Sequence, residues 1–259
     1  MNPVLLYKEL PKTNCGDCNY KTCMAFAVAV NKGDEELQAC IHLDKDKAVE
    51  LAGQIKKVDW REKIIKSLTE EISHIKVKDI ADGLGGKIVP DGVEVRCLGR
   101  DLVMGSCRQI KAKEGKVTPW EKILLLLYVK MSGSCDIAKQ WVSFEELRGG
   151  AVKIEAIIKD SEKPMAEVFR IDTKKAGEAL ESVGARRVYE GHNADYAWQI
   201  ELLPKIPVLI LYWAADEEFP DRIKILFDKT ADKFLDVESI TFLCENFVKV
   251  IADMVAPEE

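Results

Sequence analysis

Three cysteines stand close together near the start of the chain, and a fourth follows at a distance. Cys15, Cys18 and Cys23 lie within nine residues, and Cys40 completes a C-x2-C-x4-C-x16-C spacing. Zinc and iron–sulfur clusters are both bound by cysteine thiolates, and both can take four of them. The short gaps keep three sulfurs on one tight loop, so the spacing predicts a four-thiolate metal centre.

The residues around these cysteines are suited to a tight loop followed by a helix. Four of them tolerate turns or left-handed backbone: Asn14, Gly16, Asp17 and Asn19. Apolar residues then recur at helical intervals after Cys23, and the sequence Asn-Lys-Gly at 31–33 is a helix stop. We expect Gly33 to let the chain double back and bring Cys40 to the open corner of the site.

Two kinds of metal centre compete for this motif. Structural zinc is typically held by two C-x(2–4)-C knuckles, and only the first half of the motif resembles one. Cys40 has no neighbouring CxxC or HxxxH partner. A [4Fe–4S] cluster also takes four thiolates, and three from one loop plus one remote is a common pattern for it. The spacing therefore favours one [4Fe–4S] cluster, with zinc as the alternative. The expected ligands are Cys15, Cys18, Cys23 and Cys40.

His42 lies two residues beyond the fourth cysteine. It could donate to a cluster sulfur or serve as an alternative ligand. Because four thiolates already complete the site, we favour a surface histidine at the start of the next helix.

The segment "LPKTNCGDCNYKTCMAFA...C" resembles a small iron–sulfur module found in two settings. One is the large corrinoid iron–sulfur subunit of the carbon monoxide dehydrogenase/acetyl-CoA synthase system, and the other is the cluster-bearing subunit of ion-pumping electron-transport complexes. The resemblance covers roughly residues 5 to 45. It implies that the four matching cysteines bind one [4Fe–4S] cluster. The family often has proline after the last cysteine, where this chain has Ile41 and His42.

Composition narrows the class of protein. The chain has 259 residues, of which 47% are hydrophobic and 32% charged, as in ordinary globular proteins. Its net charge of −6 argues against broad binding to nucleic acid or anionic membranes. The N-terminus lacks signal-peptide features, and the longest apolar run, at 123–129, is too short to span a bilayer. We therefore expect a cytoplasmic protein without membrane insertion, in which the eight cysteines are thiols or metal ligands.

The remaining sequence predicts an α+β fold in two domains. These are a small helical iron–sulfur module at 1–58 and a larger domain at 59–259 with an antiparallel β-sheet and packed helices. Charged amphipathic patterns predict helices at 44–59 and from Trp60 onward. We expect three short strands between 87 and 105, with Cys97 on the middle one. A capped buried helix is expected at 118–131 and a short capped helix begun by Ser143 and Glu146 and stopped at 149–150. The remaining expected elements are a helix at 172–184, strands at 196–202, 208–213 and 223–227, and a closing helix that carries Cys244.

This later region also resembles a known family. Segments such as "VPDGVEVRCLGRDL" and "LLPKIPVLILYWAADEEFPDRIKILFD" are similar to an uncharacterised domain of anaerobic microbes that often carries the same iron–sulfur module. The resemblance covers most of residues 60 to 255 and implies no reaction.

Two groups of charged residues could form a second site. The acidic group could bind a cation or act in acid–base chemistry, although a solvated turn is the favoured interpretation: Asp216, Glu217, Glu218 and Asp221. The basic group could line an anion pocket, although solvated strand edges are favoured: Arg96, Arg100 and Arg108. His192 has no neighbouring serine or cysteine that would indicate a triad.

Three functions follow from these features. The first is one-electron transfer to a redox protein, for which the resemblance suggests a corrinoid or one-carbon enzyme in anaerobic metabolism. The second is an enzyme whose C-terminal domain binds a small molecule near the candidate second site. The third is a structural or oxygen-sensing role for the cluster. The sequence determines neither whether the protein is an enzyme nor its oligomeric state.

Overall fold

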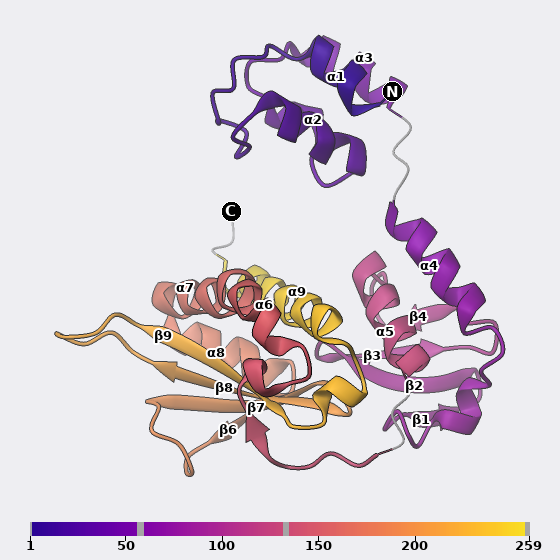
Figure 1. Cartoon of the computed structure of the whole chain (residues 1–259), viewed down its shortest axis with the longest axis vertical. Helices are drawn as coiled ribbons and strands as arrows, with labels where there is room; N and C mark the ends of the chain where they lie inside the picture. Colours follow the sequence, from indigo (N-terminus) through magenta and orange to yellow (C-terminus); the bar gives the residue numbers. More distant parts are fainter. Residues whose placement is uncertain (1, 56–59, 132–134, 257–259) are drawn as a thin grey trace. The chain divides into compact units, whose positions relative to one another are not determined.

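A computed structural model describes residues 2–55, 60–131 and 135–256 of the chain (Figure 1). The chain divides into two compact units, Met1–Lys66 and Ser67–Glu259. Helix α4, Trp60–Glu71, runs across this division. The fold combines helices with antiparallel sheets, as the sequence predicts for an α+β protein.

The first unit is helical. Its helices are α1 (Pro3–Glu9), α2 (Cys23–Lys32) and α3 (Lys45–Gln54), with a 3-10 turn at Leu37–Ala39. Thr22 begins α2 by accepting a hydrogen bond from the Ala25 N–H, and Gly33 ends it in the left-handed region at φ 84°. The predicted stop at Gly33 is therefore confirmed. Asp44 caps α3, which ends at Gln54, and residues 56–59 of the helix predicted there lie outside the described residues.

A small apolar core holds this unit together. It is formed by side chains from α1, α2, α3 and the 3-10 turn, among them Leu6, Phe26, Val30, Leu37 and Leu51. Cys23 and Cys40 are buried in the same core. Two of the predicted ligands are thus fixed by hydrophobic packing.

The second unit contains a four-stranded antiparallel sheet in the order β1-β2-β3-β4. Its strands are β1 (Lys87–Val89), β2 (Gly92–Cys97), β3 (Arg100–Met104) and β4 (Ile110–Ala112). The first three are the predicted strands, and Cys97 lies buried on the middle one as expected. Strand β4 is not predicted by the sequence pattern, since it has only three residues and one neighbouring strand.

A five-stranded antiparallel sheet follows in the order β5-β9-β8-β7-β6. Its strands are β5 (Trp141–Val142), β6 (Arg186–Val188), β7 (Tyr196–Leu203), β8 (Ile206–Trp213) and β9 (Arg222–Asp228). The three long central strands were predicted, whereas the two short edge strands were not. The backbone N–H of Leu98 donates to the Leu202 carbonyl, which ties the end of β2 to β7.

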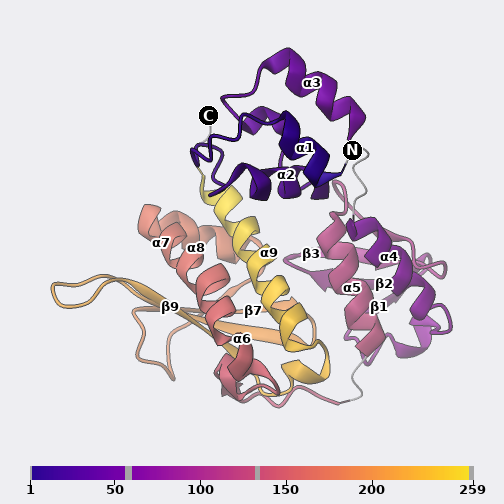
Figure 2. The same cartoon turned by 45° about the horizontal axis from the view of Figure 1, so that its top comes forward.

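Helices α6 to α9 lie on one face of the five-stranded sheet (Figures 1 and 2). They are α6 (Gly150–Ile157), α7 (Lys163–Ile171), α8 (Thr173–Ser182) and α9 (Val237–Val255). Phe169 of α7 packs against Trp198 of β7 with ring centroids 5.3 Å apart. Alternating residues of β7 face these helices and are buried, which explains the period-2 pattern of its sequence.

Helix α5, Pro119–Met131, is the apolar helix that the sequence predicts. Thr118 and Glu121 form its capping box, with the Thr118 N–H donating to the Glu121 carboxylate at 2.7 Å. Trp120 stacks on Phe242 of α9 at 4.9 Å. The side chain of Tyr128 is buried and donates to the Leu84 carbonyl.

The stop predicted at 149–150 is wrong, because these glycines begin a helix. The capping box of Ser143 and Glu146 is present, but it opens only a 3-10 turn at Phe144–Glu146. Gly149 adopts φ 86° and α6 starts directly after it. A Cβ on Gly150 would lie 1.8 Å from the Phe144 carbonyl oxygen, so this close turn requires glycine.

The helical stretch 150–171 is also absent from the predicted elements. A π-helical turn, Ile158–Glu162, joins α6 to α7, and the Lys163 N–H bonds the Ile158 carbonyl five residues back. Pro164 follows immediately, and proline inside a helix has no N–H and clashes with the carbonyl four residues before it. The wider turn lets the helix continue past Pro164.

Candidate metal centre

The loop that carries three of the cysteines is shaped by left-handed residues. Positive φ angles occur at Asn14 (51°), Gly16 (86°) and Asn19 (63°). The Asn19 N–H donates to the Gly16 carbonyl at 2.9 Å, and the Cys23 N–H donates to the Asn14 side-chain oxygen at 2.8 Å. The second bond fixes the start of the loop to the start of α2. Sequence reasoning predicted this turn chemistry from residue types alone.

The fourth cysteine arrives from the 3-10 turn after α2. The Cys40 N–H donates to the Leu37 carbonyl at 3.2 Å, and the side chain of Cys40 is buried. All four predicted ligands line one hollow, together with Tyr20, Phe26 and Ile41. Cys15 is exposed, Cys18 half-buried, and Cys23 and Cys40 buried. The hollow therefore has an open side at Cys15 and a closed side against the core.

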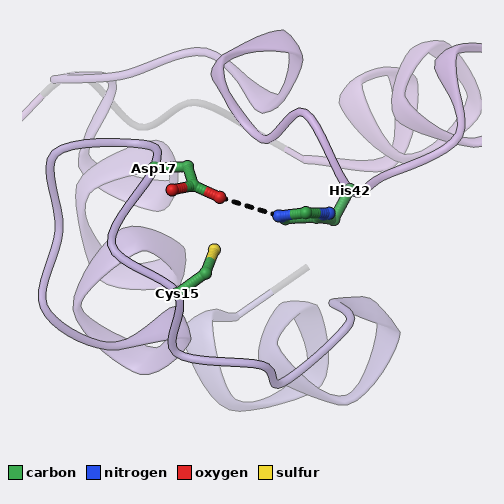
Figure 3. Close-up of side chains that lie close together, drawn as sticks. All are labelled: Cys15, Asp17 and His42. Carbon is green, nitrogen blue, oxygen red and sulfur yellow. Dashed lines mark hydrogen bonds and ion pairs between the residues drawn. The ribbon is translucent and has the colours of Figure 1, made fainter.

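An acid–base pair joins the two segments that carry these cysteines (Figure 3). The Nε2 atom of His42 lies 2.8 Å from a carboxylate oxygen of Asp17, and both side chains are exposed. Ligand atoms of Cys15, Asp17 and His42 all lie within 4.8 Å of one another. Hydrogen bonds from His42 and then from Cys15 hold the pKa of Asp17 below its ordinary value.

His42 is therefore exposed, as expected, but it does not start the next helix. Helix α3 begins at Lys45, and His42 lies in the turn before the cap Asp44. From the sequence, Asp17 is expected only to be a turn residue. A pair separated by 25 positions leaves no periodic signal, so only the folded loop brings these two residues together.

The sulfur positions bear on which centre the site can hold. Within the described part of the chain, no three cysteine sulfurs lie within 4.8 Å of one another, although Cys15, Asp17 and His42 do so. Tetrahedral zinc, with bonds of about 2.3 Å, needs sulfurs about 3.8 Å apart. A cluster whose thiolates bind separate irons accepts a wider set. The four-thiolate donor set and the left-handed loop fit such a cluster.

The other four cysteines do not line this hollow. Cys97 and Cys244 are buried in the second unit, and burial raises the pKa of each thiol. Cys107 and Cys135 are exposed. The packing role expected for Cys97 and Cys244 is consistent with their burial.

The three arginines do not converge on an anion pocket. Arg96 donates to the Val183 carbonyl at 2.8 Å, and Arg100 pairs with Glu121 at 2.6 Å. Arg108 donates to backbone carbonyls that follow α4: Ile72, Ser73 and Ile75. Each guanidinium therefore bonds a carbonyl or a carboxylate of the fold itself. These contacts do not support the anion pocket that the sequence offered as an alternative to solvated strand edges.

The acidic segment between β8 and β9 forms a turn. Asp216 accepts hydrogen bonds from the N–H groups of Glu218 and Phe219, and those bonds lower its pKa. Asp221 forms a two-point pair with Arg170 at 3.0 and 3.3 Å. His192 bonds backbone groups of Val188 and Ala194. The contacts of Asp216 agree with the turn interpretation of the acidic segment.

Comparison with known proteins identifies the class of the first unit and the family of the second. Residues 10–42 match the family model described as "Putative Fe-S cluster". Residues 76–250 match the family described as "Domain of unknown function (DUF3786)". That match covers more than half of the chain, so the protein belongs to the DUF3786 family. No solved structure matches the chain.

Several curated proteins match short stretches of the chain. A corrinoid/iron–sulfur protein large subunit of Moorella thermoacetica is 49% identical over 35 residues, which cover 14% of this chain and 8% of that protein. An acetyl-CoA decarbonylase/synthase complex subunit gamma of Methanothermobacter thermautotrophicus is 44% identical over 46 residues, covering 18% and 10%. A subunit of an ion-translocating oxidoreductase complex of Buchnera aphidicola is 29% identical over 65 residues, covering 25% and 38%. The chain thus spans well under half the length of these relatives. Their similarity, with the family match at 10–42, supports an iron–sulfur protein.

Proposed function

We propose that this protein binds one [4Fe–4S] cluster and acts in one-electron transfer. The observation that carries the proposal is the hollow lined by all four cysteines of the motif. The proposed ligands are Cys15, Cys18, Cys23 and Cys40. We also propose that residues 1–58 form the iron–sulfur module and residues 59–259 the second domain.

Burial and loop geometry support this assignment. Cys23 and Cys40 are anchored in the apolar core, so their thiolates are held from two different segments. The hydrogen bond from the Cys23 N–H to the Asn14 side chain fixes the loop that carries Cys15 and Cys18 to the start of α2. The single remote Cys40, with no second C-x(2–4)-C knuckle, favours a cluster over a single tetrahedral zinc ion.

Electron transfer follows from a complete set of protein ligands. A bound [4Fe–4S] cluster supplies outer-sphere transfer of single electrons. The four cysteines leave no position for substrate, and the exposed side chain of Cys15 puts one edge of the site at the surface. A partner can therefore approach this edge closely.

The proposed partner is a redox protein, and the relatives suggest a corrinoid or one-carbon enzyme. Two of them are named as a corrinoid/iron–sulfur subunit and a subunit of an acetyl-CoA decarbonylase/synthase complex. We propose an oxygen-poor cytoplasm as the location. Within the described ranges, no helix is both long and apolar enough to cross a bilayer.

The test is anaerobic purification with iron and sulfide analysis and EPR before and after dithionite. We expect about four irons and four sulfides per chain and a signal that appears on reduction. Cys15→Ala and Cys40→Ala should lose it. Cys107→Ala is the matched control, because Cys107 is an exposed cysteine outside the hollow. Stoichiometric zinc without a signal would refute the proposal.

A further inference from the structure

Asp17 sits between two of the proposed cluster ligands in sequence and against one of them in space. Its carboxylate lies within 4.8 Å of the Cys15 sulfur and hydrogen-bonds to His42 (Figure 3). Both Asp17 and His42 line the hollow that holds the four cysteines. A negative charge is thus held beside the most exposed sulfur of the site.

The position of this carboxylate is set by His42. Asp17 belongs to the loop of the first three cysteines, whereas His42 follows Cys40 on the other segment. The 2.8 Å contact between them holds the carboxylate in a fixed orientation across the two segments. Without that contact, an exposed aspartate side chain is free to rotate toward solvent.

A carboxylate beside a sulfur ligand makes one-electron reduction of a bound cluster less favourable. The potentials of iron–sulfur sites depend on net charge, hydrogen bonds to sulfur and solvent exposure. Asp17 adds negative charge at the open edge of the hollow, and the effective dielectric constant there is below that of bulk water. The carboxylate therefore stabilises the oxidised form relative to the reduced form.

We propose that Asp17 lowers the reduction potential of the cluster and that His42 is the positioning residue that keeps its carboxylate against Cys15. This inference rests on the proposed function. It predicts a cluster that is harder to reduce than the same cluster without this carboxylate.

The test is a redox titration of the full-length protein with its cluster, followed by EPR. We expect Asp17→Asn to raise the equilibrium constant for one-electron reduction of the cluster several-fold. A tenfold increase would correspond to a reduction potential about 59 mV higher. Asp46→Asn is the matched control, because Asp46 is an exposed aspartate of the same unit that does not line the hollow. It should leave the potential unchanged. Asp17→Glu keeps the charge and should stay closer to wild type than Asp17→Asn.

Two further arms separate an electrostatic effect from a structural one. The Asp17→Asn shift should shrink at 1 M salt, where the Debye length falls to about 3 Å. His42→Gln should raise the potential when residue 17 is aspartate and have no effect in the Asp17→Asn background. An equal His42→Gln effect in both backgrounds would overturn the positioning role.

The outcomes distinguish this inference from the function on which it rests. A full cluster with the same potential in wild type, Asp17→Asn and Asp46→Asn would overturn the inference and leave electron transfer standing. A wild-type protein without an iron–sulfur cluster would overturn both. If Asp17→Asn fails to hold its cluster, the His42→Gln titration decides the question, and an unchanged potential there refutes the inference.

Discussion

The carboxylate of Asp228 accepts a 2.6 Å hydrogen bond from the backbone N–H of Lys139, a residue 89 positions earlier in the chain. Asp228 also accepts from Ala138 N–H and from both the N–H and the hydroxyl of Thr230. Its side chain is buried at the end of β9. One carboxylate thus joins β9 to the segment that precedes β5.

These contacts predict acid-sensitive stability. Burial alone would raise the pKa of Asp228, but the hydrogen bonds from Thr230, Ala138 and Lys139 outweigh it and hold the pKa below the ordinary value. A group whose folded pKa is lowered contributes stability above its unfolded pKa, near 3.9, and loses it as pH falls through the folded value. Asp228→Asn should cost about 1–3 kcal/mol at pH 7 and progressively less below pH 4.

Urea denaturation of both proteins at several pH values measures this difference. Glu217→Gln is the control, because Glu217 is an exposed acidic residue in the β8–β9 turn. A destabilisation by Asp228→Asn that is independent of pH would contradict the assignment to the charged form.

Glu162 should show the opposite dependence on pH. Its side chain is buried beside β9 and accepts from the Ile225 N–H, with Lys224 at 3.5 Å. Burial raises the pKa of Glu162, and the hydrogen bond to Ile225 and the charge of Lys224 only partly oppose this. A raised folded pKa means that the contribution to stability is full below the unfolded pKa and falls as pH rises through the folded one.

The measurement compares wild type with Glu162→Gln, which keeps an oxygen acceptor for Ile225. We expect the advantage of wild type over the variant to be largest near pH 4 and smallest near pH 7. An advantage that grows with pH would mean that the ion pair with Lys224 dominates over burial.

Gly150→Ala should strongly destabilise the second unit. The added Cβ would lie 1.8 Å from the Phe144 carbonyl oxygen, so the backbone of the 3-10 turn must move. We expect a loss of about 3 kcal/mol or more in thermal or urea unfolding. Gly191→Ala is the control, since φ is 81° there but no atom lies within 4 Å of the added Cβ. Its cost should be only the backbone strain of about 1–2 kcal/mol, and equal losses in the two variants would refute the clash.

Asn14→Ala should reduce cluster occupancy while leaving all four cysteines in place. The variant loses the acceptor for the Cys23 N–H and the tolerance of asparagine for φ 51°. We expect fewer irons per chain after anaerobic reconstitution and faster iron loss to a chelator, by several-fold. Thr13→Ala replaces the neighbouring exposed residue and should behave as wild type. Identical iron retention in the two variants would show that the loop does not need Asn14.

The sequence predicts the elements whose signals are local and misses those that depend on distant partners. The strand predicted at 208–213 and the helix predicted at 118–131 have long apolar runs, which are typical of buried elements, and the structure has them at Ile206–Trp213 and Pro119–Met131. Strand β5 has two residues and exists only because β9 pairs with it. The stretch 150–171 is not predicted because Pro164 argues against a continuous helix. The π turn that lets the helix continue has no periodic signal in the sequence.

The candidate site divides in the same way. Cysteine spacing and turn residues predict the four ligands and the loop between the first three, because those constraints are local. The spacing carries no information on which sulfur faces solvent. The contact between Asp17 and His42 also depends on how the two segments meet in the folded unit.

The unequal burial of the four cysteines leaves one side of the proposed centre more accessible to solvent than the others. Cys23 and Cys40 are enclosed by the apolar core, whereas Cys15 is open to solvent. If the four cysteines held a cluster, the Cys15 side would be the one that oxidants and chelators reach most easily, whereas the apolar core would shield the side held by Cys23 and Cys40. The edge at which we propose that a partner exchanges electrons is therefore also the edge most accessible to oxygen.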